Sequence, residues 1–249
     1  MNLAIDEAIL EARIQGIVPT TLRFWRNNRA VILGRSQKVC AEVNLEECIK
    51  ERIQVVKRFS GGGTVYHDLG NLNYTIVLDS NDRLVKGLDI AGSYRILCSG
   101  IIKGLELLGL SSISFLPPGN IFICGKKISG SAQLRRRNVI LHHGTLLVDS
   151  DLNVLKKALT VYNDEKRRES TSVWSPLTKI RDELNREISM TEVKHALIRG
   201  FEESLSIELE PGNIKSAENE IASKNYYIKY LHLNEKTENI YFRKFSFVV

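Results

Sequence analysis

The sequence predicts an α+β fold, with a mixed β-sheet flanked by helices. Segments with strand character gather in the middle of the 249-residue chain, and segments with helical periodicity lie at both ends and between them. The two kinds of segment do not alternate regularly, as they would in a wound parallel sheet. A hydrophobic content of 43% and a charged content of 26% are ordinary for a globular protein.

Apolar periodicity and turn residues place the elements of the first half. Apolar residues recur at spacings of three and four in the helices, and alternate or run together in the strands. Asparagine suits both a turn and an N-cap, because its side chain bonds to nearby backbone groups. The predicted elements are a helix over 2–15 ended by Gly16, strands over 21–26 and 30–34 with a turn at Asn27 and Asn28, a short helix over 44–52 capped by Asn44, a strand over 71–78 and a helix over 91–108.

The second half begins with short strands broken by glycine and continues with helices. Ser189 and Glu192 form a capping box that predicts the start of one helix. We expect residues 1–249 to form a single domain. The predicted elements are strands over 121–124, 127–132 and 139–148, a helix over 152–159, an irregular charged stretch over 163–171, a helix from 189 to about 204, and a tail over 206–249 with a strand, a charged helix and an aromatic end at Tyr241, Phe242, Phe245 and Phe247.

Charge and composition exclude several classes of protein. The net charge is +6, but the cations are dispersed, aromatic residues make up only 7%, and no nucleic-acid-binding motif is present. No run of 18 apolar residues occurs, and the N-terminus has no basic region typical of a signal peptide. The four cysteines form no CxxC pair. We therefore expect a cytoplasmic protein with reduced thiols, and neither a membrane nor a nucleic acid as partner.

A glycine loop is the most unusual feature of the sequence. Residues 60–63 read Ser-Gly-Gly-Gly, follow Arg58, and lie between the apolar pair 55–56 and the strand over 71–78. Three successive glycines cost backbone entropy, and a turn alone needs only one or two. The loop is therefore either a glycine-rich hairpin with a bulge or a backbone cradle for an anion beside Arg58. It matches neither the Walker nor the dinucleotide-binding pattern.

A second unusual stretch begins at Lys127, which opens a strand of small residues over 129–132. Such residues either pack tightly or leave room for a ligand beside the lysine. The pair His142-His143 follows. Neighbours on a strand point to opposite faces, so we expect the two histidines not to share a ligand and one of them to be structural or exposed. No third ligand has a suitable spacing, so no metal site is predicted.

Taken in order, six stretches resemble the lipoate–protein ligase family. They are NLAIDEA, LRFWRNNRAVILGRSQ, KRFSGGGTVYHDLGNLNYT, KKISGSAQ, LHHGTLL and STSVWSPLTKI, and they span about residues 2–205. The resemblance implies the catalytic-domain fold that lipoate ligases share with the more distant biotin ligases. It also implies an enzyme that activates lipoate with ATP to lipoyl-adenylate and passes the lipoyl group to a lysine of a carrier domain. The implied carriers are lipoyl domains of 2-oxoacid dehydrogenase E2 subunits and the glycine cleavage H protein, and Mg²⁺ is expected to accompany ATP.

The resemblance further implies roles for individual residues. Lys127 is the implied catalytic residue, in contact with both the lipoate carboxylate and the α-phosphate of ATP. A fixed cation there fits the chemistry, because attack of one anion on another needs positive charge to offset their repulsion. The residues implied to bind ATP are Arg58, Gly63, Thr64, Val65, Tyr66 and Lys127. Those implied to bind lipoate are Lys127, Ser60, Gly61, Gly62 and His143. No protein ligand of a metal is assigned.

The sequence departs from a related branch of cysteine-dependent octanoyltransferases. That branch carries its nucleophilic cysteine shortly before a KxSGSAQ strand, and residues 112–120 here contain no cysteine. Cys124 is expected to pack within a strand rather than to act as a nucleophile. Adenylation is therefore favoured over thioester transfer. An octanoyltransferase that uses an octanoyl carrier protein, and a non-catalytic subunit that binds lipoyl groups or nucleotides, stay open as alternatives.

Three further departures concern the completeness of the unit. Full-length ligases carry a small additional C-terminal domain, which archaeal-type relatives supply as a separate protein, so we expect a separate accessory subunit. The family also has a strand before the helix over 2–15, and we expect that strand to be missing here. Finally, Trp174 and Pro176 replace basic residues that are common in the family.

Overall fold

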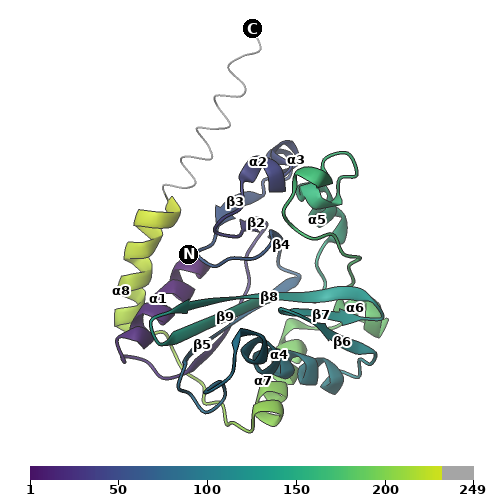
Figure 1. Cartoon of the computed structure of the whole chain (residues 1–249). Helices are drawn as coiled ribbons and strands as arrows, with labels where there is room; N and C mark the ends of the chain where they lie inside the picture. Colours follow the sequence, from purple (N-terminus) through teal and green to yellow (C-terminus); the bar gives the residue numbers. More distant parts are fainter. Residues whose placement is uncertain (232–249) are drawn as a thin grey trace.

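The computed structural model describes residues 1–231, which form two β-sheets surrounded by helices (Figure 1). The larger sheet has six strands in the order β1–β5–β9–β8–β7–β6, and every neighbouring pair is antiparallel. The predicted α+β class is confirmed. The strands of this sheet are β1 (Thr21–Trp25), β5 (Asn71–Asp79), β6 (Ile113–Leu116), β7 (Asn120–Ile123), β8 (Lys126–Arg136) and β9 (Val139–Leu147).

The smaller sheet has the order β3–β2–β4, with β2 (Ala30–Leu33) between β3 (Gln54–Lys57) and β4 (Val65–His67). Strand β2 pairs parallel to β3 and antiparallel to β4, so this sheet supplies the mixed pairing. The glycine loop joins β3 to β4 and crosses from one side of β2 to the other. The hairpin interpretation of the loop is therefore wrong, because β3 and β4 do not pair. The turn at 27–28 likewise joins strands of different sheets and not a hairpin.

Two long helices cover one face of the six-stranded sheet, α4 (Ile90–Leu107) and α7 (Met190–Leu205) (Figure 1). Asp89 caps α4 by accepting a hydrogen bond from the N–H of Gly92, and Ser189 caps α7 by accepting one from the N–H of Glu192. The apolar faces of both helices bury against the sheet and contribute Leu97, Ile101 and Phe201 to the main hydrophobic core. These helices therefore cover one face of the six-stranded sheet, and the smaller sheet lies on the other face.

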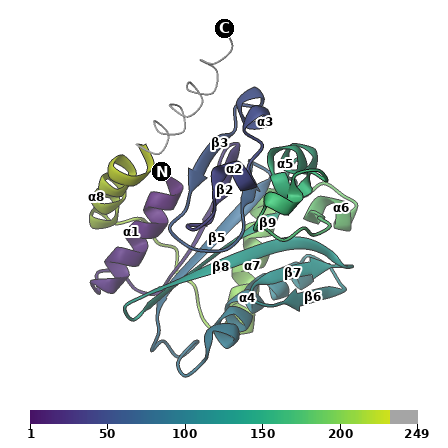
Figure 2. The ribbon, with the colours of Figure 1, turned by 45° about the horizontal axis from the view of Figure 1, so that its top comes forward.

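The remaining helices lie around the edges of the two sheets (Figure 2). Helix α1 packs against α8 beside β5, while α2, α3 and α5 lie beside the smaller sheet. These elements, with the short helical turns, are α1 (Asn2–Ile14), α2 (Val39–Glu42), α3 (Leu45–Lys50), α5 (Leu152–Ala158), α6 (Ile180–Leu184), α8 (Ser216–Asn225), 3₁₀ turns at Thr160–Tyr162 and Arg167–Glu169, and a π-helical segment at Tyr226–Leu231. Within residues 1–231, no helix has the length and apolar character needed to cross a membrane.

The predicted helices and most predicted strands are confirmed, including the Asn44 cap on α3. Strand β6 was not predicted, because it is a four-residue edge strand followed directly by Pro117. Strand β8 extends beyond the expected 127–132 to Arg136, because it stays paired with β9, which is itself paired with β5 as far as Val139. Residues 206–231 contain α8 and the π-helical segment but no strand. The aromatic end over 241–247 lies outside the described residues.

Candidate functional site

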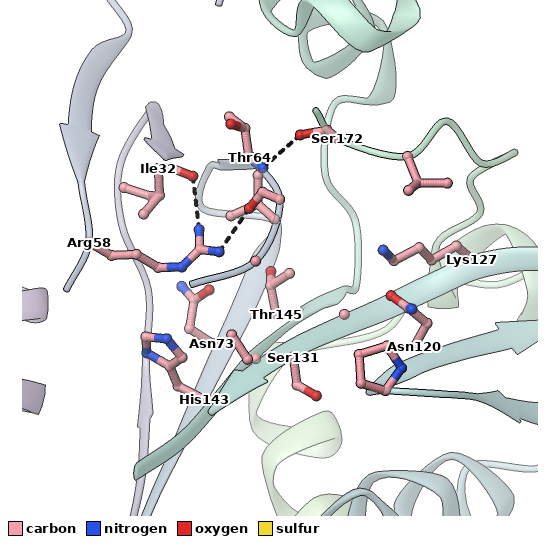
Figure 3. Close-up of a pocket in the computed structure, with 18 of the residues that line it drawn as sticks. Ile32, Arg58, Thr64, Asn73, Asn120, Lys127, Ser131, His143, Thr145 and Ser172 are labelled. Carbon is pink, nitrogen blue, oxygen red and sulfur yellow. Dashed lines mark hydrogen bonds between the residues drawn. The ribbon is translucent and has the colours of Figure 1, made fainter. Parts of the chain in front are cut away.

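A cavity of about 410 Å³ lies between the two sheets (Figure 3). This volume is typical of small-molecule sites. Its walls are formed mainly by the smaller sheet with the glycine loop, the strands β8 and β9, the turn between β6 and β7, and the segment 171–175. Leu3, Trp25 and Asn73 complete them. A second cavity of about 80 Å³ adjoins it and shares Thr64, Lys127 and Ser172 with the first. The two unusual stretches of the sequence therefore meet at one site.

Arg58 is buried beneath the glycine loop and holds it by its carbonyl oxygens. Its Nη2 donates to the carbonyls of Gly61 (2.5 Å) and Gly63 (2.8 Å), and its Nη1 donates to the carbonyl of Ile32 (3.1 Å). The Nε donates to the Ser60 hydroxyl at 3.0 Å. Within residues 1–231, no carboxylate is among its partners. Burial lowers the pKa of Arg58 to about 10, so the guanidinium is still charged at neutral pH.

These bonds turn the carbonyls of the loop toward Arg58 and leave several N–H groups of the loop free. Within residues 1–231, no hydrogen-bond acceptor faces the N–H of Gly61, Gly62 or Gly63. Gly62 and Gly63 line the main cavity, beside the guanidinium. Free N–H groups next to a buried cation are a suitable site for an anion such as a phosphate. The geometry therefore agrees with the cradle interpretation.

A short segment over 170–173, here called the strap, closes the cavity above the loop. Its hydroxyl and N–H groups bind the carboxylate of Glu42, which is 1% exposed. Ser172 donates its hydroxyl to Glu42 at 2.6 Å, and the N–H of Thr171 donates to it at 2.6 Å. Burial alone would raise the pKa of Glu42, but the hydrogen bonds from Ser172, Thr171 and Ser170 outweigh it and lower the pKa. The ionised carboxylate thus anchors the strap to α2.

The strap is joined to the glycine loop through Ser172. The Ser172 hydroxyl accepts the N–H of Thr64 at 2.9 Å and the side-chain amide of Gln37 at 3.0 Å. The carbonyl of the same Gln37 amide accepts the Thr64 hydroxyl at 2.8 Å and the N–H of Gly34 at 2.9 Å. Helix α2, the strap and the loop are therefore one connected hydrogen-bond network.

Lys127 enters the cavity from the side opposite Arg58 (Figure 3). Its backbone is fixed twice, because its N–H donates to the carbonyl of Pro176 (2.8 Å) and its carbonyl accepts the N–H of Thr178 (3.0 Å). Gly130 leaves room for the lysine, since a methyl group at Gly130 would lie 3.1 Å from Nζ. No carboxylate within residues 1–231 lies at ion-pair distance from Nζ. Partial burial lowers the pKa of Lys127, and no acidic partner within residues 1–231 opposes this shift.

The two histidines on β9 face opposite sides of the sheet, as predicted. His143 lines the cavity and contacts Ser60, whereas His142 faces α4 and contacts Cys98 and Gln133. We expected one of them to be structural or exposed, and His142 is structural, because it is a buried packing residue. Neither histidine is exposed. Burial lowers the pKa of both, to about 3 for His142. Both are therefore neutral at physiological pH.

None of the four cysteines lines either cavity. Cys40 and Cys124 are exposed, and Cys48 and Cys98 are buried. The expectation that Cys124 packs within a strand is wrong, because Cys124 occupies the turn between β7 and β8 with a φ of 48°. Burial raises the pKa of Cys98 to about 11, so its thiol is protonated at neutral pH even though His142 lies 3.9 Å away. The cavity therefore contains no thiol nucleophile.

The structure brings most of the sequence-predicted site residues together. Tyr66 lines only the smaller cavity, while Ser60 and Gly61 line neither and Ser60 is completely buried behind the loop. Sequence reasoning missed Glu42, for which nothing in its local pattern was distinctive. The predicted residues that line the main cavity are Arg58, Gly62, Gly63, Thr64, Val65, Lys127 and His143.

Other residues of the site could have been recognised within the resembling stretches. Gln37 lies in LGRSQ and Ser172 in STSVW. Polar side chains that join two loops give no periodic signal. Their importance appears only when the loops are seen in contact. The described residues also include no group of three or more histidine, cysteine or acidic side chains placed to hold a metal.

Comparison with known proteins places this chain in a family. Residues 1–202 match the Lipoyl protein ligase A/B catalytic domain. The chain is 36% identical to lipoate-protein ligase A subunit 1 of Thermoplasma acidophilum, over 92% of this chain and 88% of that protein. It is also 33% identical to the octanoyltransferase LipM of Oceanobacillus iheyensis, over 91% of this chain and 90% of that protein.

Solved structures give the same result. A bipartite lipoate protein ligase from T. acidophilum, studied with its E2 lipoyl domain, superposes with a TM-score of 0.78 at 33% identity and covers 92% of this chain and 88% of its own. A T. acidophilum ligase structure with bound lipoic acid gives 0.74 at 31% identity, covering 90% and 88% of the two chains. A lipoate-protein ligase A bound with ATP gives 0.77 at 32%, covering 92% and 89%. The chain therefore belongs to the lipoyl protein ligase A/B catalytic-domain family.

Proposed function

We propose that the chain is an ATP-dependent lipoate–protein ligase, which forms lipoyl-adenylate and transfers the lipoyl group to a lysine of a carrier domain. The observation that carries the proposal is Lys127, a half-buried lysine with no carboxylate of residues 1–231 at ion-pair distance, in a cavity that contains no thiol. A buried charge is costly unless it is paired. An anionic substrate would supply the missing partner. Structures of relatives with bound lipoic acid and with bound ATP support this choice of substrates.

In the first step a carboxylate oxygen of lipoate attacks the α-phosphorus of ATP and pyrophosphate leaves. Both reactants are anions, so their approach needs fixed positive charge. Lys127 is placed to contact the carboxylate and the α-phosphate together, which also orients them. Arg58 contributes its charge from the opposite wall, while its N–H groups hold the loop. Around the nucleotide we place Gly63, Thr64 and Val65, with Tyr66 behind them in the smaller cavity.

In the second step the amine of a carrier lysine attacks the acyl carbon, AMP leaves, and the amine loses one proton. Gly62 and His143 would line the acyl group, and Ser60 and Gly61 would act on it only through Arg58 and the loop. An E2 lipoyl domain and the glycine cleavage H protein are the proposed carriers, and a separate accessory subunit is proposed to complete the enzyme. The bipartite ligase of T. acidophilum with its E2 lipoyl domain supports these partners.

Mg²⁺ is proposed to arrive with ATP. Mg²⁺ is commonly held by substrate phosphates and water, with few protein ligands. Within residues 1–231 the absence of a cluster of metal-binding side chains fits an ion that enters on the phosphates. It would neutralise phosphate charge, while Lys127 and Arg58 serve the reacting oxygens.

Octanoyl transfer from a carrier protein is the second candidate, because octanoyltransferases are among the similar proteins. This reaction would form a thioester on a cysteine and would need no ATP. The two candidate thiols are Cys98, which lies 3.6 Å behind Ser131 of the cavity wall, and Cys124, which is exposed. A third hypothesis is that the chain is a subunit that binds lipoyl groups or nucleotides without catalysis. It predicts binding but no product.

The test is to incubate the protein with lipoate, ATP and Mg²⁺, with and without the accessory subunit of an archaeal relative, and to measure lipoyl-adenylate by mass spectrometry. We expect adenylate from the wild type and none from Lys127→Met, which keeps the length of the side chain without its charge. Substrate binding without adenylate under every condition would favour the non-catalytic subunit. An acyl-enzyme formed from octanoyl carrier protein, lost on Cys98→Ser or Cys124→Ser, would favour the transferase.

A further inference from the structure

Behind the glycine loop, a line of polar side chains leads from Arg58 into helix α1. The Ser60 hydroxyl lies 2.6 Å from Nε2 of His143, and Nδ1 of His143 faces the carboxylate of Asp6 at 3.8 Å. The order of the groups is that of a serine–histidine–aspartate triad. Ser60, however, is completely buried and lines neither cavity. The line therefore cannot present a nucleophile to a ligand, and it needs another explanation.

The hydrogen bonds determine which nitrogen of His143 carries the proton. Arg58 can only donate, so Ser60 must accept from its Nε. The Ser60 hydroxyl then has one hydrogen to donate, and within residues 1–231 its only available acceptor is Nε2 of His143. If Nε2 were protonated instead, the buried Ser60 hydrogen would have no partner, which is costly. His143 is neutral, because burial lowers its pKa, so its single proton belongs on Nδ1.

Asp6 favours this arrangement from the other side of the ring. Its carboxylate is 0% exposed, and it is held by Arg23 at 2.6 Å and by the Thr75 hydroxyl at 2.7 Å. Thr75 is the cross-strand neighbour of His143, so β5 fixes the carboxylate beside the ring. The distance of 3.8 Å is longer than a direct hydrogen bond, so Asp6 acts on Nδ1 through its charge. A buried anion favours a proton on the nitrogen that faces it.

We propose that Asp6 is a positioning residue, which fixes the Nδ1-protonated tautomer of His143 and thereby lets Ser60 and Arg58 hold the glycine loop in its binding conformation. The chain of effects runs from Asp6 through His143 and Ser60 to Arg58, which holds the carbonyls of Gly61 and Gly63. Asp6 touches neither cavity. The consequence for adenylation rests on the proposed function, whereas the tautomer of His143 does not.

The direct test is the nitrogen spectrum of the histidine ring. Protein labelled with ¹⁵N in its histidines distinguishes protonated from unprotonated ring nitrogens, and the His143→Gln variant assigns the signals of His143. We expect the wild type to carry its proton on Nδ1. In Asp6→Asn we expect a measurable fraction to move to Nε2. Glu42→Gln neutralises another buried carboxylate and serves as the control, so it should leave the His143 signals unchanged.

A wild-type spectrum with the proton on Nε2 would overturn the proposal without any variant. The proposal can therefore be tested even if Asp6→Asn does not fold. An unchanged tautomer in a folded Asp6→Asn would overturn it as well. For adenylation, Asp6→Asn should lower the rate in proportion to the fraction of His143 that moves to Nε2, so an equal mixture of the two tautomers would lower it about twofold. It should cause no further loss in the His143→Gln background, because Asp6 acts through His143. Additive losses would show an independent structural role.

Discussion

Gly62 offers a direct test of the way Arg58 holds the loop. Its φ is +89°, and a methyl group at this position would lie 2.9 Å from Nη2 of Arg58. Gly62→Ala should therefore destabilise the folded protein in two ways. An L-residue in this left-handed region costs about 1–2 kcal/mol. Arg58 cannot yield cheaply to the methyl group, because the same nitrogen donates to the carbonyls of Gly61 and Gly63.

The magnitude follows from these two terms. If the methyl group displaces Nη2 from one carbonyl, the loss is that of one hydrogen bond from a charged donor, about 1.5–3 kcal/mol. Gly62→Ala should therefore lower the free energy of unfolding by about 2.5–5 kcal/mol in total. Gly109→Ala is the matched control, because Gly109 has a φ of +92° and a methyl group there would meet no atom within 4 Å. It should show the backbone cost alone.

The two variants are compared by thermal unfolding and by the rate of adenylate formation. A difference of about 1.5–3 kcal/mol corresponds to a midpoint about 3–12 °C lower for Gly62→Ala than for Gly109→Ala. The adenylation rate should fall about a hundredfold in Gly62→Ala, because a loop displaced by about 1 Å can cost that much. Equal unfolding midpoints in the two variants, with an unchanged adenylation rate in Gly62→Ala, would show that Arg58 does not hold the loop through these bonds.

Three further predictions concern charge and thiols at the site. Lys127→Met should abolish adenylation but raise the unfolding midpoint, because it removes a half-buried amine that has no carboxylate of residues 1–231 at ion-pair distance, and calorimetry of the free protein checks this. The lowered pKa of Glu42 stabilises the folded protein above the ordinary glutamate value, and this contribution is lost as the pH falls through the lowered pKa. The protection factors of the strap amides, which correct for the slower intrinsic exchange in acid, should therefore fall on acidification in the wild type and vary less with pH in Glu42→Gln. Serine at both Cys98 and Cys124 should leave ATP-dependent lipoylation within a few-fold of wild type, measured on a lipoyl domain, and a complete loss would contradict adenylation.

Much of the fold could be predicted from local patterns, because its helices carry their own signals. Helices α3 and α7 begin at the asparagine and serine caps that the sequence indicated. The pairing of the strands could not be predicted, because register and neighbours depend on distant segments. The turn at 27–28 was expected from its two asparagines, but its strands belong to different sheets, which their sequence did not indicate. Local turn chemistry is the same in both cases.

The site shows the same division. Arg58, Lys127 and the glycines were found because charged and glycine residues are unusual between apolar strands. The direction of the bonds was not foreseen. Arg58 was expected beside free N–H groups, whereas it also binds the carbonyls of the loop and so keeps those N–H groups free. Glu42 and Asp6 escaped notice because an acidic residue on a helix usually faces solvent, and only the tertiary structure buries these two.

In the proposed reaction the carboxylate of lipoate attacks the α-phosphorus of ATP in the cavity between Arg58 and Lys127. Lipoate labelled with ¹⁸O in its carboxylate tests this directly, because aminolysis of lipoyl-adenylate leaves one carboxylate oxygen on AMP. The protein, ATP, Mg²⁺, a lipoyl domain and the accessory subunit are incubated together, and the mass of AMP is measured. We expect one ¹⁸O atom in AMP for each lipoyl group transferred by the wild type, and no labelled AMP with Lys127→Met. Lipoylation that yields only unlabelled AMP, or no AMP, would contradict it.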